Sequence, residues 1–221
     1  MDDFALALRD GNLDLIREMI REDLRLLNRK DSRGYTPLHK AAARDRVELA
    51  QMLISLGAPV DINSHSGVTP LSVSLCAGHE KMAEYLILQG ANPKISDKLG
   101  WTPLHSSALR GVGLKLLLPR CPDVNLRHKS GWTPLHLACY RGLTEPVQIL
   151  IENKANLNLR DRCGWTPLHY ASYRGNVPVV KLLLDKGANA FARNKAHKSP
   201  GDIAREKGHP DIEKLIRQVA A

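Results

Sequence analysis

A four-residue motif, Thr-Pro-Leu-His, constrains this chain more than any other feature, because it recurs at an almost constant spacing. Four full copies begin at Thr36, Thr102, Thr133 and Thr166, and a copy with Ser in place of His begins at Thr69. A degenerate copy begins at Ser199, and the successive steps are 33, 33, 31, 33 and 33 residues. A fixed period of this length is typical of repeat proteins, in which each unit buries its apolar side only against its neighbours. We therefore expect a linear stack.

Each unit carries the signals of two short helices. Thr133 is a good N-cap, and Pro134 follows at the first helical position, where its missing amide costs nothing. The side chain of His136 can bond back to the Thr hydroxyl, as in a capping box. Gly142 then breaks the first helix, and an apolar second helix ends at a Gly such as Gly187. The remaining residues of each unit are expected to form a hairpin-like extended loop.

The motif and its period resemble the ankyrin repeat over essentially the whole chain. This resemblance implies an all-α solenoid of about seven helix-turn-helix repeats with hairpin loops, whose first helices and hairpins line a concave side. The repeats lie near 1–35, 36–68, 69–101, 102–132, 133–165, 166–198 and 199–221, and the first and last of them are caps. The first repeat lacks the motif, and the last ends in an amphipathic helix at 211–219. Since no Pro/Ser-rich linker interrupts the series, we predict a single domain, 1–221.

The fourth repeat, 102–132, is two residues short. The loss falls between Gly111 and Asp123, so its second helix should be short. Two interpretations are open: a tolerated deletion on the convex side, or a bend or notch that a partner uses.

The residue pattern argues against catalysis, metal and cofactors. His39, His105, His136 and His169 hold one repeat position, so capping explains them, and in a stack they lie too far apart to share a metal ion. The sequence has no nucleophile elbow and no glycine-rich phosphate loop. Cys76, Cys121, Cys139 and Cys163 include no CxxC pair, so we read them as small, semi-buried core thiols, with the exposure of Cys121 and Cys163 left open. We predict a non-enzyme.

Two features of the sequence indicate where in the cell the protein is found. No run approaches the roughly 20 apolar residues of a membrane helix, and the acidic start, MDDFALALRD, is unlike a signal peptide. We expect a cytoplasmic protein, with the nucleus as a second compartment and no membrane contact. Capped ends favour a monomer.

Basic residues are concentrated in the second half. Residues 1–101 carry 13 Lys/Arg and 14 Asp/Glu, whereas residues 102–221 carry 19 and 9. Counting from the motif Thr as position one, position nine holds Arg44, Arg110, Arg141 and Arg174. Two hairpin positions hold Arg127, Arg160 and Arg193, and Lys98, Lys129, Arg162 and Lys195. These rows predict a basic groove, because Arg pairs well with carboxylates and phosphates. The alternative is charge that only keeps the protein in solution.

Aromatic residues accompany these rows. Tyr35, Trp101, Trp132 and Trp165 each precede a motif, Tyr140 and Tyr173 hold position eight, and Tyr170 holds position five. Trp, Tyr and Arg together are typical of interface hot spots. The alternative for the Trp residues is packing on the neighbouring hairpin. An aromatic cage for methyl-lysine is disfavoured by the basic surroundings.

These features together predict a protein-interaction scaffold or adaptor. We expect its basic, aromatic concave surface in repeats four to six to bind an acidic surface or segment of another protein. Its length and repeat number resemble those of gankyrin-like proteasome assembly chaperones, which implies a role as an assembly chaperone or regulator. The alternatives are a nucleic-acid binder, which the absence of any nucleic-acid module disfavours, a host-directed effector using the same surface, and a structural spacer.

Overall fold

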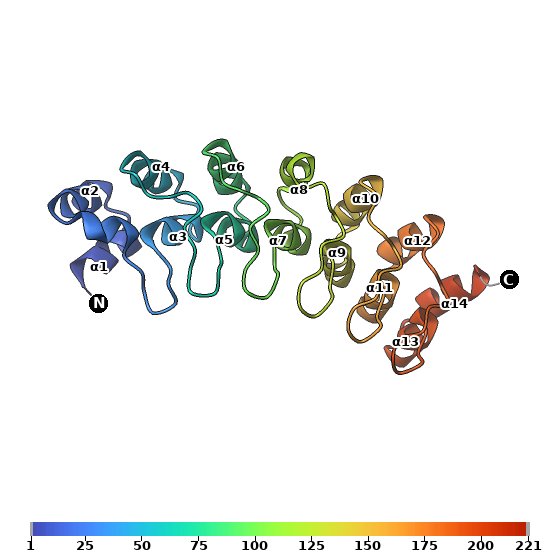
Figure 1. Ribbon diagram of the computed structural model, residues 1–221. Helices are drawn as coiled ribbons and strands as arrows, with labels where there is room; N and C mark the ends of the chain where they lie inside the picture. The colour runs from blue at the N-terminus through green and yellow to red at the C-terminus, as the bar shows by residue number, and fades with distance from the viewer. Residues whose placement is uncertain (1, 220–221) are drawn as a thin grey trace. The chain divides into compact units, whose positions relative to one another are not determined.

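The computed structural model describes residues 2–219, which form helices and loops with no strand among them (Figure 1). The predicted all-α solenoid is confirmed. The chain divides into two compact units, Met1–Lys98 and Leu99–Ala221, and each is described by itself. We call them unit 1 and unit 2. The expectation of one domain over 1–221 stays a prediction.

Unit 1 contains three helix pairs. Its elements are α1 (Asp3–Asp10), α2 (Leu13–Glu22), the 3-10 turn η1 (Leu24–Asn28), α3 (Pro37–Ala42), α4 (Val47–Ser55), α5 (Pro70–Ala77) and α6 (Glu80–Leu88). Helix α3 packs on α5, while α2 packs on α4 and α4 on α6. The core between the two rows consists of fully buried aliphatic side chains such as Ile16, Leu38, Leu53 and Leu75. As predicted, 2–35 forms a first repeat without the motif.

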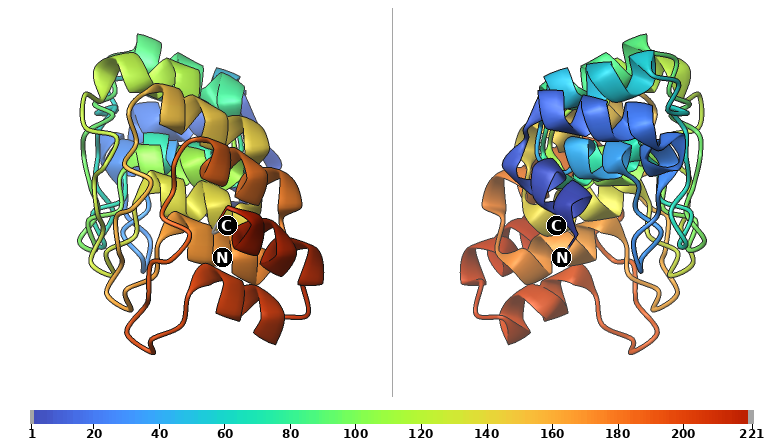
Figure 2. Two further views of the ribbon diagram at one scale, coloured as in Figure 1. Left: turned by 90° about the vertical axis from the view of Figure 1, so that its right-hand side faces the viewer. Right: turned by 90° about the vertical axis from the view of Figure 1, so that its left-hand side faces the viewer.

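Unit 2 contains four helix pairs. Its elements are α7 (Pro103–Arg110), α8 (Leu114–Leu117), the 3-10 turn η2 (Leu118–Arg120), α9 (Pro134–Arg141), α10 (Thr144–Glu152), α11 (Pro167–Arg174), α12 (Val177–Asp185), α13 (Pro200–Glu206) and α14 (Pro210–Gln218). The first helices α7, α9, α11 and α13 pack in one row, and the second helices form a parallel row. Within each unit the hairpin loops leave the helices on one side (Figure 2).

Helix α8 confirms the shortened fourth repeat. It has 4 residues, against 9 in α10 and α12, and passes directly into η2. Its N-cap, Gly113, adopts a left-handed φ of 71°.

Four motif histidines, His39, His105, His136 and His169, each link their repeat to the next. In unit 2 the Nδ1 atom of His136 accepts from the amide of Thr133 at 3.1 Å and lies 2.8 Å from its hydroxyl. Because Nδ1 is thus an acceptor, the proton is on Nε2, which donates to the Trp165 carbonyl 3.1 Å away. His39 makes the same bridge to Val68, His105 to Trp132 and His169 to Lys198. The predicted capping role is confirmed, and each ring also fastens the hairpin of the following repeat.

Neighbouring hairpins in unit 2 are joined by one backbone hydrogen bond each. The amides of Lys129, Arg162 and Lys195 donate to the carbonyls of Leu99, Ser130 and Cys163, at 2.8, 3.0 and 3.0 Å. Asparagine side chains add a second link, because the Asn125 and Asn158 oxygens each accept an amide of the next repeat at 2.8 Å. Gly164 is required here, since a Cβ would lie 2.9 Å from the Lys195 amide nitrogen.

Lys154 stands where other repeats have the glycine that ends the second helix, and it adopts a left-handed φ of 66°. We expect Lys154→Gly to raise the free energy of unfolding by about 1 kcal/mol, because a non-glycine residue is strained there. Lys186→Gly is the matched control. Lys186 has a φ of −92°, so the same exchange there should be neutral or destabilising. Urea unfolding of the three proteins checks this, and an unchanged Lys154→Gly variant would contradict it.

The buried histidines should make stability depend on pH. Burial lowers the pKa of His136 from 6.5 to about 4 and also lowers the pKa of His39 and His169. Between these two pKa values the unfolded chain binds more protons than the folded chain. The stabilisation is therefore complete above pH 6.5 and is lost progressively as the pH falls from 6.5 to about 4. For His136 alone the loss from pH 7.5 to 5.0 should be about 2 kcal/mol.

His136→Ser provides the test, because it imitates the natural Thr69–Ser72 pair, whose hydroxyls are 3.2 Å apart and do not titrate in this range. The variant should be less stable at pH 7.5 by about 1–3 kcal/mol, since the Trp165 carbonyl loses the His136 donor and keeps only the Asp161 amide, 2.9 Å away. Its stability should nevertheless fall less than that of the wild type between pH 7.5 and 5.0 in urea unfolding. Equal pH dependence of the two proteins would exclude this role for His136.

Candidate protein-interaction surface

All predicted site residues lie in unit 2, on the first helices α7, α9, α11 and α13 and on the hairpins that precede them. We call this surface the hairpin face. The aromatic members are half-buried. The basic members, Arg110, Arg127, Lys129, Arg141, Arg160, Arg162 and Arg174, are exposed. The repeat register therefore places on one surface residues that are far apart in sequence.

Tyr170 is the centre of a continuous aromatic cluster. Its ring centroid lies 4.3 Å from that of Trp132, 4.8 Å from that of Trp165 and 6.0 Å from that of Tyr140. Tyr173 extends the cluster beyond Trp165, at 5.8 Å. Such tilted and edge-on pairs are favourable ring geometries. Trp132 and Trp165 thus pack against a ring of another element and remain half-buried, while their role in binding stays a prediction.

Trp101 lies beside two histidines, one of which connects it to this cluster. Its indole nitrogen donates to the Ser106 hydroxyl at 2.7 Å, and its ring contacts His105 and His128 at 5.5 and 5.2 Å. His128 is also 6.4 Å from Trp132, so it connects Trp101 to the other rings. Sequence periodicity does not single out His128, because no other histidine holds the same repeat position.

A buried carboxylate fixes the centre of the cluster. The hydroxyl of Tyr170 donates to Asp161 Oδ2 at 2.6 Å, while Asp161 Oδ1 accepts the amides of Cys163 and Trp165 at 2.8 Å each. Burial, reinforced by the adjacent carboxylate, raises the pKa of Tyr170 well above its ordinary value. The hydroxyl therefore stays protonated and keeps donating. Asp161 is 6% exposed, so its carboxylate interacts with groups inside the protein.

Two cations lie on tyrosine rings. The guanidinium carbon of Arg174 is 5.1 Å from the centroid of Tyr140, and the Lys207 ammonium is 4.7 Å from that of Tyr173. In both cases position nine of one repeat stacks on position eight of the preceding repeat. Lys207 was missed at the sequence level, although counting from Ser199 places it at position nine. Arg141 has no such ring, because Leu109 holds position eight of the preceding repeat.

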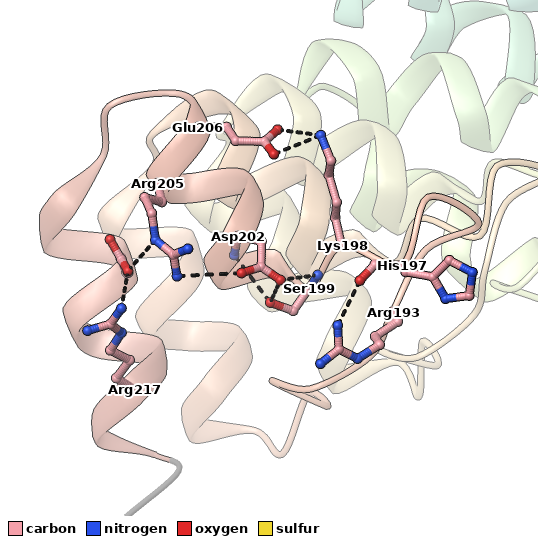
Figure 3. A network of polar contacts seen from close by, with 9 residues as sticks. Arg193, His197, Lys198, Ser199, Asp202, Arg205, Glu206 and Arg217 are labelled. Atoms are coloured by element: carbon pink, nitrogen blue, oxygen red, sulfur yellow. Dashed lines mark hydrogen bonds and ion pairs between the residues drawn. The ribbon is translucent and has the colours of Figure 1, made fainter.

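The hairpin cations are of two kinds. Arg127 donates to the Arg160 carbonyl, and Arg193 Nη1 donates to the His197 carbonyl at 2.8 Å (Figure 3), so these two side chains help to hold the loops. Within residues 2–219, by contrast, the side chains of Lys129, Arg160 and Arg162 form no ion pair or hydrogen bond. An incoming anion can therefore pair with Lys129, Arg160, Arg162 or Arg141 without breaking an existing contact.

The acids of this face are already engaged. Asp123 accepts the Asn125 amide at 2.8 Å, and Asp161 is buried. Glu206 pairs with Lys198 at 2.7 Å, and Asp202 caps its helix by accepting from the Ser199 amide and hydroxyl at 2.9 and 2.7 Å (Figure 3). These four acids stand against the seven exposed cations named above, so the hairpin face carries a net positive charge.

No helix between residues 2 and 219 is both long and apolar enough to cross a bilayer. In the same range, no three His, Cys, Asp or Glu side chains are grouped so that they could hold a metal ion. Cys121 and Cys139 are buried, but the reading of Cys163 as a core thiol is wrong, because it is exposed on a hairpin. Its position follows the Asp161 turn, which directs the side chain outward.

Comparison with known proteins agrees with this architecture. The family model for ankyrin repeats in three copies matches residues 4–97, 84–161, 112–194 and 140–218. The chain belongs to the ankyrin-repeat family. It is 36% identical over 52 residues to ankyrin repeat domain-containing protein 49 of Drosophila melanogaster, which covers 24% of each chain. It is also 39% identical over 51 residues to human ankyrin repeat and SOCS box protein 3, covering 23% of this chain and 10% of that protein. These matches span less than a quarter of either relative's length.

The Tyr170–Asp161 bond of this ankyrin-repeat protein can be tested by removing one hydroxyl. We expect Tyr170→Phe to lower the free energy of unfolding by about 1–2 kcal/mol, because the buried carboxylate loses a charge-assisted partner. Tyr173→Phe is the matched control, since the Tyr173 hydroxyl makes no hydrogen bond within the described chain, and it should change stability by less than about 0.5 kcal/mol. Thermal or urea unfolding distinguishes them, and equal effects would refute the special role of Tyr170.

Proposed function

We propose that this ankyrin-repeat protein is a non-catalytic scaffold or adaptor, and that the hairpin face of unit 2 binds an acidic protein segment. Ankyrin repeats generally mediate protein–protein interaction, which supports the adaptor role. The observation that carries the finer proposal is the set of exposed, unpaired cations, Lys129, Arg141, Arg160 and Arg162, beside a face whose acids are all engaged. Charge complementarity of this kind gives specificity and fast association.

The aromatic cluster gives this surface an apolar component. Trp132, Trp165 and Tyr173 are half-buried, and hot spots combine such rings with Arg, as found here for Arg174 on the Tyr140 ring. Successive repeats are separated by about 10 Å, the usual distance between packed helices, so an extended segment with carboxylates about three residues apart would meet one cation row per repeat. We expect the chain to act as a monomer in the cytoplasm, with the nucleus as a second compartment, as an assembly chaperone or regulator.

The test is a pull-down from cell lysate with the wild type and with a variant in which Arg141, Arg162 and Arg174 are all changed to Glu. The control variant carries Lys181→Glu, Lys186→Glu and Lys214→Glu, which changes the net charge equally but lies on or beside the second helices. We expect an acidic protein to be retained by the wild type and the control and lost from the arginine variant. Retention by all three would refute the proposed surface.

Nucleic acid is the other outcome that this experiment can reveal. Because the rings of Tyr170 and its neighbours are packed against one another, they are poorly placed to accept stacked bases, and we favour a protein. If nuclease treatment of the lysate abolishes retention, the proposal fails in favour of nucleic acid. In that case the apparent affinity for duplex DNA should fall with salt at a slope of about −0.9 per phosphate contacted.

A further inference from the structure

Unit 1 contains a hollow on the side that carries its hairpins and first helices. Its volume is about 430 Å³, and Tyr35, His39, Lys40, Ala43, Arg44 and Val73 line it. Tyr35 precedes α3, His39 and Lys40 lie in it, Ala43 and Arg44 follow it, and Val73 lies in α5. The volume lies within the range that is usual for binding pockets in proteins.

Repeat register shows what fills the equivalent place in unit 2. The counterparts of Tyr35, His39 and Ala43 are Trp132, His136 and Tyr140, and position five of the next repeat is Tyr170 where unit 1 has Val73. The Tyr170 ring packs 4.3 Å from Trp132, 5.9 Å from His136 and 6.0 Å from Tyr140, measured between centroids. The hollow of unit 1 is therefore the space that an aromatic ring occupies in unit 2.

A second difference leaves this hollow open at its rim. In unit 2 the guanidinium of Arg174, at position nine, covers Tyr140 at position eight of the preceding repeat. In unit 1 both positions hold alanine, Ala77 and Ala43. The two residues that would close the site from within the chain, at positions five and nine of the repeat 69–101, are thus both small.

The lining indicates the chemistry of an occupant. The Tyr35 ring stands 5.2 Å from the His39 ring at 46°, and Val73 provides an aliphatic wall. Both nitrogens of His39 are already bonded, to Thr36 and to the Val68 carbonyl, so this ring offers the occupant only its face and edge. Lys40 is shared with Asp31, 3.5 Å away. Arg44 is exposed and forms no ion pair within the described chain, so an anion beside the ring would pair with it.

We propose that this hollow binds the Tyr or Phe side chain of an acidic segment of a protein partner. The ring enters the space that Tyr170 fills in unit 2 and packs on Tyr35, His39 and Val73. A flanking carboxylate pairs with Arg44 at the rim. This site goes beyond the proposed function, because it lies in unit 1 and uses no residue of the hairpin face.

Two peptides test the proposal: acetyl-Glu-Glu-Tyr-Glu-Glu-amide and the same peptide with Ala in place of Tyr. Binding is followed by nuclear magnetic resonance on the backbone amide of Ala43, which lines the hollow and is present in every variant. We expect the Tyr peptide to bind the wild type about tenfold more tightly than the Ala peptide, because a buried ring adds apolar contact. A preference below about twofold would overturn the proposal.

Val73→Tyr is the decisive variant, because it restores the ring that unit 2 has at this position and fills the hollow from within. It should reduce the preference for the Tyr peptide to less than about twofold while raising the melting temperature of the protein. Retention of the full preference by a folded Val73→Tyr protein would place the ring elsewhere. Arg44→Glu should weaken both peptides and leave their ratio unchanged, whereas an unchanged affinity would remove Arg44 from the site.

The hairpin-face variant, with Arg141, Arg162 and Arg174 changed to Glu, separates this inference from the proposed function. Its preference for the Tyr peptide should equal that of the wild type at the Ala43 amide. Loss of the preference in this variant would show that the ring binds unit 2, and the inference would fail even if the adaptor role were correct.

Discussion

The bridge made by the motif histidine is the interaction on which the rest of the fold depends. One ring accepts from the Thr cap of its own repeat and donates to a carbonyl at the start of the next, as His136 does between Thr133 and Trp165. The ring is buried and neutral, so it connects two backbones without placing a charge in the core. Because the acceptor carbonyl is next to the following Thr, each bridge also positions the next cap. The motif therefore specifies both a helix start and the joint between two repeats.

Much of this could be read from the sequence because the responsible signals are local. Thr, Pro, His and Gly act within a few residues, so the caps, the helix breaks and the short α8 were predicted correctly. The exposure of Cys163 and the position of Lys207 on Tyr173 were not. The first depends on how the Asp161 turn directs one side chain. The second depends on a contact between neighbouring repeats. It can be predicted from the sequence only when the repeat positions are also counted from Ser199, in the degenerate last copy.

The candidate sites were predicted as a set of residues, but the division of roles among these residues was not. Sequence periodicity put Arg127 and Arg162 in equivalent rows, yet Arg127 bonds a carbonyl of the next hairpin while Arg162 forms no such contact in the described chain. Periodicity likewise could not show that Tyr170 would be the centre of the rings or that Val73 would leave a hollow. Position five can differ from repeat to repeat because its side chain takes no part in the Thr–His caps or in the backbone hydrogen bonds between hairpins. The same scaffold can therefore present a filled surface in one unit and an open one in the other.

The cations that lie on tyrosine rings have a further consequence for recognition. Long basic side chains normally sample many rotamers, and ordering one of them on binding costs roughly 0.5–1.5 kcal/mol of conformational entropy. Arg174 and Lys207 are already restrained by Tyr140 and Tyr173 before any partner arrives. Arg141, with leucine in place of the ring, keeps its rotational freedom. Equal electrostatic contacts to these three residues would therefore contribute unequally to affinity, with the restrained pair contributing more.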